Sequence, residues 1–343
     1  MRIQVNARNR GYDFDAQSGE RVLYAGLRTG IDLPYECATG TCGTCKAKLV
    51  SGRVRDRWPG APGRKFARQA GEFLMCQCEA EEELTLEVSK FVYPMEPGAC
   101  VPQTCRGTVR SVRRLTHDVI AFALELERLR DFDAGQFALL APEGIDGYRA
   151  YSMCNYERGG RSFDFVVKRK PDGAFSEWLF GADRDGARLE VFGPLGKATF
   201  EPGLGKNLLC IAGGSGIAGM MSILARADAA DYFSRHKGYL FFGIRTMRDA
   251  FFLQELSNFK EANLAVTVAL SEEEIPEKTK QDWPVLKFEK GLVHEVAKRE
   301  MAGKYQNVRA YVAGPPPAVD AAIRVLLLDA KLTTDNIRYD KFS

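Results

Sequence analysis

Apolar and polar residues alternate along residues 1–92 in a way that predicts a helix packed on a mixed sheet. The run Ile3–Asn6 alternates with a period of two, which is typical of a strand with one buried face. Residues 20–27 instead carry apolar side chains at helical spacing, and Gly30 follows where a glycine commonly ends a helix. A later apolar run, Leu84–Val88, predicts a closing strand. We therefore expect this stretch to form one small domain.

Three segments with different patterns of apolar and polar residues follow that domain. Residues 93–104 carry three prolines and a glycine, the composition of a semi-rigid linker. Residues 105–203 hold short β-type runs separated by turn residues, which predicts an antiparallel barrel. Residues 204–343 alternate apolar strands with helical stretches, the pattern of a doubly wound α/β domain. The expected barrel strands are 107–112, 119–126, 135–141, 163–167 and 188–191, and the expected α/β strands are 208–212, 238–242, 264–270 and 310–313.

Composition narrows the possible partners. Of the 343 residues, 45% are apolar and 27% are charged, and the net charge of +3 is small for a nucleic-acid-binding protein. No apolar run approaches the ~20 residues that cross a bilayer, and residues 1–20 lack the apolar core of a signal peptide. We therefore expect no nucleic acid and no membrane as partner. Nine cysteines without a secretion signal favour a cytoplasmic location, where thiols stay reduced.

Four cysteines carry the most specific chemical signal. Cys37, Cys42 and Cys45 form a Cys-x4-Cys-x2-Cys run, and Cys76 follows later in the chain. This is the plant-type ligand spacing of a [2Fe–2S] cluster. A zinc site would more naturally show paired Cys-x2-Cys knuckles or histidines, and a disulfide framework belongs to small secreted chains. The three histidines are scattered, which argues against a Rieske or haem site built on histidine pairs.

The segments Pro34–Cys45 and Phe73–Cys78 resemble the plant-type [2Fe–2S] ferredoxin domain of oxygenase reductases, which deliver electrons to ring-hydroxylating dioxygenases and soluble multicomponent monooxygenases. The resemblance covers essentially the whole chain. It implies a multidomain α+β and α/β protein with a β-grasp ferredoxin, an antiparallel FAD-binding β-barrel and a doubly wound α/β nucleotide-binding domain. In that family the first cysteine of the Cys-x-Cys pair is the ligand, which selects Cys76 over Cys78.

The run Arg149-Ala150-Tyr151-Ser152 resembles the Arg-x-Tyr-Ser motif of the ferredoxin-NADP reductase superfamily. The resemblance implies that Arg149 pairs with the flavin pyrophosphate, Tyr151 stacks on the isoalloxazine and Ser152 approaches its N5 atom. A guanidinium fork suits phosphate oxygens, and a tyrosine ring offers a flat face. The resemblance also implies a second strand and a phosphate-binding helix start, formed by Val166, Lys168, Gly173, Ala174, Phe175 and Ser176, with a closing turn at Gly193–Gly196. Because the ferredoxin domain comes first, it implies FAD rather than FMN.

A glycine-rich turn marks the expected nicotinamide site. The strand 208–212 runs into Gly213-Gly214-Ser215-Gly216, a turn that exposes backbone N–H groups to a pyrophosphate. Together with Gly219 these glycines also satisfy Gly-x-Gly-x-x-Gly, a weak signal when it stands alone. The acid expected about twenty residues later in that fingerprint is missing. The reductase pattern Gly-Gly-x-Gly-Ile-Ala fits better, with Gly219 in place of the usual proline.

Three more segments join this site by resemblance. Gly243 and Arg245 resemble the second nucleotide segment, and Gly314-Pro315 resembles a Cys-Gly-Pro-Pro turn in which Ala313 replaces the cysteine. Phe342 resembles a terminal aromatic residue that covers the flavin until nicotinamide displaces it. NADH is the expected donor because oxygenase reductases mostly use it. Arg245 leaves NADPH possible, since an arginine near this strand end can accept a 2′-phosphate.

Three carriers in one chain imply one order of electron flow. NADH gives a hydride, a [2Fe–2S] cluster accepts single electrons, and a flavin handles both. The expected path runs from NADH to FAD, the cluster and a terminal oxygenase, directly or through a separate ferredoxin. A Rieske dioxygenase is favoured over a soluble diiron monooxygenase. Two alternatives are a carrier or sensor module with a vestigial flavin half, and a stand-alone NAD(P)H flavoenzyme that reduces small molecules. The intact nucleotide motifs argue against the former and the cluster argues against the latter.

One charged run has no place in these sites. Six basic residues follow the cluster loop: Arg53, Arg55, Arg57, Arg64, Lys65 and Arg68. Such a run is usually a solvated face. As a hypothesis, it steers docking to an acidic patch on an oxygenase.

Overall fold

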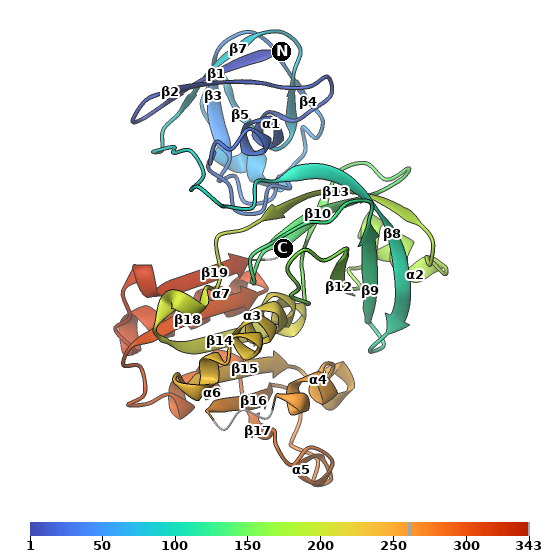
Figure 1. Cartoon of the computed structure of the whole chain (residues 1–343), viewed down its shortest axis with the longest axis vertical. Helices are drawn as coiled ribbons and strands as arrows, with labels where there is room; N and C mark the ends of the chain where they lie inside the picture. Colours follow the sequence, from blue (N-terminus) through green and yellow to red (C-terminus); the bar gives the residue numbers. More distant parts are fainter. Residues whose placement is uncertain (260–262, 342–343) are drawn as a thin grey trace. The chain divides into compact units, whose positions relative to one another are not determined.

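The computed structural model describes residues 1–259 and 263–341 (Figure 1). Residue contacts divide the chain into two units. The first comprises residues 1–106, 138–150 and 190–195, and the second comprises residues 107–137, 151–189 and 196–343. In the described ranges, no helix has the length and apolar character needed to cross a membrane.

The N-terminal part of the first unit is a mixed five-stranded sheet with one helix, α1 (Val22–Arg28). Strand β1 pairs antiparallel with β2 and parallel with β7, and β3 pairs antiparallel with both β7 and β5. Ile3 and Val5 are fully buried, as the alternation predicts. The β-grasp prediction is confirmed. The strands are β1 (Arg2–Ala7), β2 (Gly11–Asp15), β3 (Lys46–Ser51), β5 (Glu72–Leu74) and β7 (Leu84–Val88), and β4 (Val54–Asp56) pairs with β6 (Cys78–Ala80) in a small second sheet.

The middle of the chain forms the predicted antiparallel barrel. Its sheet order is β11-β10-β13-β8-β9-β12, and a bridge between Met153, just after β11, and Phe165 of β12 links the two outer strands. Strand β13 continues through Gly193–Leu195, so the expected closing turn shrinks to Gly196, whose φ is 105°. The strands are β8 (Gln103–Arg114), β9 (Val119–Leu126), β10 (Phe137–Pro142), β11 (Arg149–Ser152), β12 (Ser162–Lys168) and β13 (Arg188–Leu195), and the helix is α2 (Ala174–Gly181).

The C-terminal part of the second unit is a six-stranded parallel sheet in the order β17-β16-β15-β14-β18-β19. Its strands are β14 (Asn207–Gly213), β15 (Gly238–Ile244), β16 (Leu264–Leu270), β17 (Lys287–Lys290), β18 (Val308–Gly314) and β19 (Ile337–Lys341). Its helices are α3 (Ile217–Ala229), α4 (Leu253–Asn258), α5 (Thr279–Asp282), α6 (Val293–Glu300) and α7 (Pro316–Arg324), which a π-helical turn extends over Val325–Asp329.

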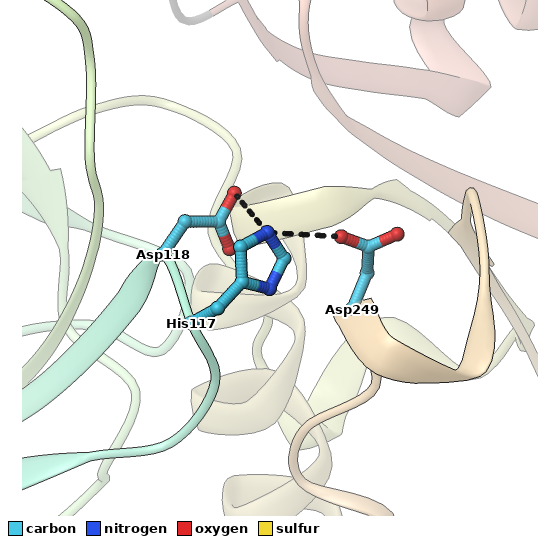
Figure 2. A group of neighbouring side chains, drawn as sticks. All are labelled: His117, Asp118 and Asp249. Atoms are coloured by element: carbon cyan, nitrogen blue, oxygen red, sulfur yellow. Dashed lines mark ion pairs between the residues drawn. The ribbon is translucent and has the colours of Figure 1, made fainter.

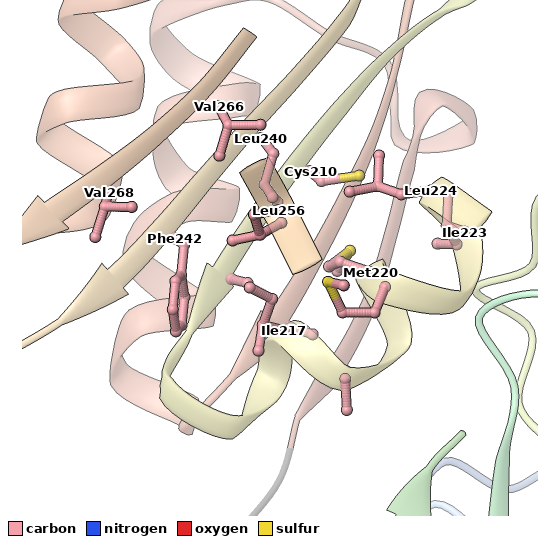
Figure 3. Close-up of a cluster of buried hydrophobic side chains, with 14 of the residues drawn as sticks. Cys210, Ile217, Met220, Ile223, Leu224, Leu240, Phe242, Leu256, Val266 and Val268 are labelled. Carbon is pink, nitrogen blue, oxygen red and sulfur yellow. The ribbon is translucent and has the colours of Figure 1, made fainter. Parts of the chain in front are cut away.

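Both faces of this parallel sheet are buried. Alternate residues of β14 belong to two different clusters: Leu208 and Cys210 pack in one, while Leu209 and Ile211 pack in the other. The first cluster contains side chains of α3 packed on the sheet (Figure 3). It also contains residues of β9 and β12 from the barrel. The second contains α6 and α7. Burial on both faces explains why these strands read as continuous apolar runs.

Candidate functional site

The structure brings the four predicted cluster cysteines into two neighbouring pairs. The Sγ atoms of Cys45 and Cys76 lie 3.2 Å apart and both residues are buried. The Sγ atom of Cys37 accepts hydrogen bonds at 3.4 Å from the backbone N–H groups of Thr39 and Cys42. The Cys42 thiol and these N–H groups lower the pKa of Cys37 to about 4. Thiol ligands with backbone donors aimed at sulfur are the set that an iron–sulfur cluster needs.

A cover segment, residues 57–68, holds the cluster loop. Gly40 and Gly43 have φ values of 90° and 76° in the left-handed region, and a Cβ on Gly43 would lie 2.6 Å from the ring of Phe66. The Gly63 N–H donates to the Gly40 carbonyl at 2.8 Å. On Gly40, a Cβ would lie 2.9 Å from Nε2 of Gln77, which also donates to Cys76 Sγ at 3.6 Å. Sequence reasoning assigned no role to Gln77, although it lies inside the Phe73–Cys78 segment, or to Phe66, which no motif marks.

Tyr24 of α1 is a third residue whose role sequence reasoning missed. Its buried hydroxyl donates to the carbonyl of Ala38 in the cluster loop at 2.9 Å. Burial raises its pKa well above the usual value, so the hydroxyl stays a donor. Within the first unit, its ring stacks on Phe192 of β13 at 4.7 Å and meets the edge of Tyr148 at 5.5 Å. Tyr24 therefore supports the loop and packs on barrel residues at the same time.

The predicted flavin residues of the Arg-x-Tyr-Ser motif all lie on β11. Arg149 is half-buried, and its Nη1 donates to the carbonyl of Tyr148 at 3.1 Å. The half-buried ring of Tyr151 lies 4.9 Å from that of Phe175, at the start of α2. Ser152 is buried. A cationic fork, an aromatic face and a hydroxyl thus follow one another along a single short strand.

The predicted flavin residues at the start of α2 act mainly through backbone atoms. Gly173 is the N-cap of α2, where the first N–H groups, from Ala174 onward, have no partner within the helix. The buried Ser176 hydroxyl accepts from the N–H of Lys170 at 3.0 Å and donates to its carbonyl at 2.9 Å, so this side chain closes the preceding loop. Val166 packs its side chain into the core, and Nζ of Lys168 pairs with Asp118 at 3.1 Å.

The predicted nicotinamide loop lies where two parallel strands end. Gly213 ends β14, and Gly214–Gly216 form a 3₁₀ turn before α3. Gly214 has a φ of 53°, and a Cβ there would meet no atom within 4 Å, which leaves room for a ligand over the turn. A Cβ on Gly216 would instead lie 2.5 Å from the backbone of Ala313, next to the Gly314-Pro315 turn. A helix start reached through glycines fits a dinucleotide pyrophosphate.

The flavin and nicotinamide sites meet at the first turns of α3. A Cβ on Gly219 would lie 3.6 Å from Ser152, so the helix passes directly beside the flavin motif. The fully buried Ser222 fixes this contact: its Oγ accepts from the Gly135 N–H and donates to the Gly219 carbonyl, both at 2.8 Å. The residue expected near flavin N5 is therefore adjacent to the first turn of α3, which directly follows the glycine turn expected to bind nicotinamide dinucleotide.

Replacement of Ser222 by alanine tests that anchor. The change leaves the buried Gly135 N–H without its partner, which should lower the free energy of unfolding by about 1–3 kcal/mol. We expect a lower melting temperature and slower reduction of bound flavin by NADH. A matched variant, Ser234→Ala, removes an exposed hydroxyl that donates to the Asp231 carbonyl, and it should change neither quantity. Equal melting temperatures for the two variants would contradict the role of Ser222.

A charged network joins the start of β9 to the segment after β15 (Figure 2). Nε2 of His117 lies 3.7 Å from Asp118 and 3.9 Å from Asp249. Asp249 also pairs with Arg245 at 3.8 Å and accepts from the N–H of Thr246 at 3.0 Å. Because the two carboxylates already have cationic partners in Lys168 and Arg245, we interpret the group as a contact network rather than as a metal centre.

The remaining predicted residues are placed as follows. Gly243 lies in β15, where a Cβ would come within 2.7 Å of Val293, and Arg245 is exposed just beyond that strand. Phe342 lies outside the described residues, so its expected position over the flavin stays a prediction.

Family models match three consecutive parts of the chain. Residues 5–81 match the 2Fe-2S iron-sulfur cluster binding domain, residues 106–200 match the oxidoreductase FAD-binding domain, and residues 210–324 match the oxidoreductase NAD-binding domain. The order agrees with the geometry of the three sites.

Comparison with whole proteins gives the same arrangement. The chain is 37% identical over 331 residues to the ferredoxin–NAD(P)+ reductase CarAd of Metapseudomonas resinovorans, covering 95% of both chains. It is 32% identical over 322 residues to the xylene/toluene monooxygenase electron transfer component XylA of Pseudomonas putida, covering 93% of this chain and 87% of the relative. The solved ferredoxin reductase in carbazole 1,9a-dioxygenase has a TM-score of 0.83 and 33% identity, covering 100% of this chain and 99% of the other.

Proposed function

This chain belongs to the iron–sulfur ferredoxin–NAD(P)+ reductases of dioxygenase and monooxygenase systems, and from that premise we propose that it delivers electrons from NADH to the terminal oxygenase of a Rieske-type dioxygenase. When bound, FAD supplies the conversion between a two-electron hydride donor and a one-electron iron–sulfur acceptor. The observation that carries the proposal is the adjacency of Ser152 to Gly219 in the first turn of α3, the helix into which the glycine turn leads, which allows hydride transfer within one unit.

The proposal gives each cluster residue a role. Cys37, Cys42, Cys45 and Cys76 supply the four thiolate ligands. The backbone N–H groups that point at Cys37 offset negative charge on its sulfur, and hydrogen bonds to ligand sulfurs tune reduction potential. The carboxamide of Gln77 does the same for Cys76. What supports these roles is the closeness of the thiols and the donor geometry around them.

The flavin and nicotinamide residues act by binding and orientation. We assign Arg149 and the first N–H groups of α2 to the flavin phosphates, because both present donors to anions. We assign Tyr151 to one face of the flavin ring. Ser152, held by the packing of β11 on α3, places a hydroxyl where the ring accepts hydride. The open turn at Gly214 receives the pyrophosphate of the nicotinamide nucleotide.

We propose NADH rather than NADPH as the donor. Arg245, the candidate 2′-phosphate ligand, already pairs with Asp249, and the N–H of the neighbouring Met247 donates to Glu273 at 2.6 Å. Carboxylates at both places would repel a 2′-phosphate. We expect a KM for NADPH at least about tenfold above that for NADH, since a net repulsion of about 1.4 kcal/mol on the 2′-phosphate corresponds to that factor. Equal KM values would contradict this preference.

The partner class is the finer part of the proposal. The carbazole dioxygenase reductase supports a Rieske oxygenase, reached directly or through a separate ferredoxin, as acceptor. The 32% identity to a xylene/toluene monooxygenase component supports the second candidate, a diiron monooxygenase reductase. We also propose a cytoplasmic location, because no disulfide joins any of the nine cysteines, all of which lie in the described ranges.

Anaerobic titration with NADH tests the central proposal. Absorbance should show bleaching of the flavin bands, and low-temperature EPR should show the rhombic signal of a reduced [2Fe–2S] cluster. Addition of an excess of an oxidised Rieske ferredoxin or oxygenase should then replace this signal with that of the reduced Rieske cluster. Flavin bleaching without a cluster signal would overturn the proposed electron path in favour of a stand-alone flavoenzyme.

A further inference from the structure

The cover segment presents both aromatic and cationic side chains at the surface next to the cluster loop. It is tied to the loop side by two backbone hydrogen bonds, from the Arg57 N–H to the Gln77 carbonyl at 2.9 Å and from Gly63 to Gly40 at 2.8 Å. The Phe66 ring lies over Gly43, between the ligands Cys42 and Cys45, yet 44% of Phe66 remains exposed. One side chain therefore reaches from solvent to the backbone of the ligand loop.

The structure separates five of the six basic residues of this region into two groups, and the sixth, Arg55, is exposed on β4. Three are neutralised by acids of the same domain: Arg53 pairs with Glu82, Arg57 with Glu79 and Arg64 with Asp56. Lys65 and Arg68 differ, because neither side chain forms an ion pair with a carboxylate in the part of the chain that the structure describes. Nζ of Lys65 lies 5.2 Å from the centre of the Phe66 ring, and Nε of Arg68 donates to the Lys65 carbonyl at 2.9 Å. These three residues, Lys65, Phe66 and Arg68, form a contiguous surface, here called the Phe66 patch.

We propose that the Phe66 patch is the docking surface for the protein that takes electrons from the cluster, and that this partner presents an acidic face with an apolar centre. The inference rests on the proposed function. Electron transfer between proteins falls steeply with distance, so an acceptor must approach the ligand loop closely. Docking on Phe66 brings it against Gly43, with one aromatic ring between the partner and the loop.

The chemistry of the patch selects the kind of partner. Aromatic and arginine side chains are enriched among residues that carry binding energy, while lysine usually contributes through rate and specificity. Among the described residues, these two cations form no ion pair with an acid, so they attract an acidic face and repel a basic one, and this steering weakens as salt screens it. A partner with a neutral or basic face would gain nothing from Lys65 and Arg68.

The chain offers a matched control far from the ligand loop in sequence. Phe91 is 54% exposed, and the Arg8 guanidinium lies 5.1 Å from its ring centre, a pair equivalent to Lys65 and Phe66. Arg8 and Arg10 are exposed and contact no carboxylate among residues 1–259 and 263–341. The double variant Lys65→Glu/Arg68→Glu and the control Arg8→Glu/Arg10→Glu therefore change the net charge equally.

The test measures electron transfer from the NADH-reduced holoprotein to two purified acceptors, an acidic [2Fe–2S] ferredoxin and the basic protein cytochrome c, at low and high ionic strength. For the acidic acceptor at low salt, the patch variant should lose about tenfold or more of the second-order rate constant, and the control less than about twofold. With the basic acceptor cytochrome c, the rate constant of the patch variant should be higher than that of the control. Flavin bleaching and the EPR signal, recorded for every variant, show whether the internal path is intact.

The aromatic part of the patch has its own comparison. Phe66→Leu should weaken saturation by the acidic acceptor several-fold at high salt, where charge steering is screened, whereas Phe91→Leu should not. An unchanged EPR spectrum in Phe66→Leu separates docking from damage to the ligand loop.

The possible outcomes distinguish failure of the Phe66 patch from failure of the proposed function. Equal losses in the patch variant and in the control would overturn the Phe66 patch, because net charge alone would then explain the effect. Unchanged rates in the patch variant, with a wild type that reduces the acidic ferredoxin, would also overturn it while leaving the proposed function standing. A wild type whose reduced cluster passes electrons to neither protein would overturn both.

Discussion

Replacement of Cys76 by serine is expected to abolish the EPR signal of the reduced cluster and to lower electron delivery to a protein acceptor on the order of a hundredfold or more. The Cys76 thiol is buried 3.2 Å from that of Cys45, so no other cysteine can take its place without movement of the backbone. Flavin bleaching by NADH should persist, because the hydride-transfer residues lie in the other unit. The measurement is anaerobic titration with NADH, followed by absorbance and EPR.

Cys78→Ser is the matched control for that experiment. Cys78 is also fully buried, only two positions further along, but it lies in β6 opposite Asp56 of β4. Serine preserves its size, and the variant should keep both the cluster signal and electron delivery. Loss of the cluster in Cys78→Ser and its retention in Cys76→Ser would show that the ligand assignment is reversed.

Replacement of Gly216 by alanine should have the second large effect. The added Cβ would lie 2.5 Å from backbone atoms of Ala313, and β18 cannot retreat without breaking its pairing with β14, where Ala212 faces Ala313. Overpacking of this kind costs about 1–3 kcal/mol. It also shifts the turn that offers N–H groups to the nucleotide. We expect a lower melting temperature and a KM for NADH raised at least about tenfold.

Gly203→Ala provides the comparison for this variant. Gly203 also lies in a 3₁₀ turn, but a Cβ there meets no atom within 4 Å and its φ needs no glycine. Its melting temperature and KM should match those of the wild type. If Gly216→Ala behaved in the same way, the close approach between the α3 turn and β18 would be absent in solution.

The sequence pattern located the long elements well and the short ones poorly. The expected bounds of β7, β9 and β16 are confirmed, because each is an apolar run whose side chains are buried. β17 and β19 were missed: they are the edge strands of the parallel sheet, and their charged residues mask the pattern. In the ferredoxin part, β2 and β3 were not predicted, and β4, β5 and β6 were missed because three residues are too few to show a period.

The candidate site residues divide into those that a local sequence signal marks and those whose roles depend on contacts distant in sequence. Cysteine spacing and glycine turns are local signals, since covalent geometry restricts which residues can occupy them. Tyr24, Phe66 and Ser222 matter only through partners distant in sequence: the Ser222 contact to Gly135 spans 87 positions. In the sequence, Tyr24 and Ser222 look like ordinary members of buried helices. Tertiary packing therefore determines their roles, and a motif cannot reveal them.

The closeness of the Cys45 and Cys76 thiols also determines how oxygen damages the cluster site. Two thiols held 3.2 Å apart can share an iron, but when the iron is lost to oxygen the same closeness favours their oxidation to a disulfide. That bond would close the chain between β3 and β6 and remove two ligands at once. Oxygen damage would then be locked in place, and rebuilding the cluster would require a thiol reductant before iron and sulfide.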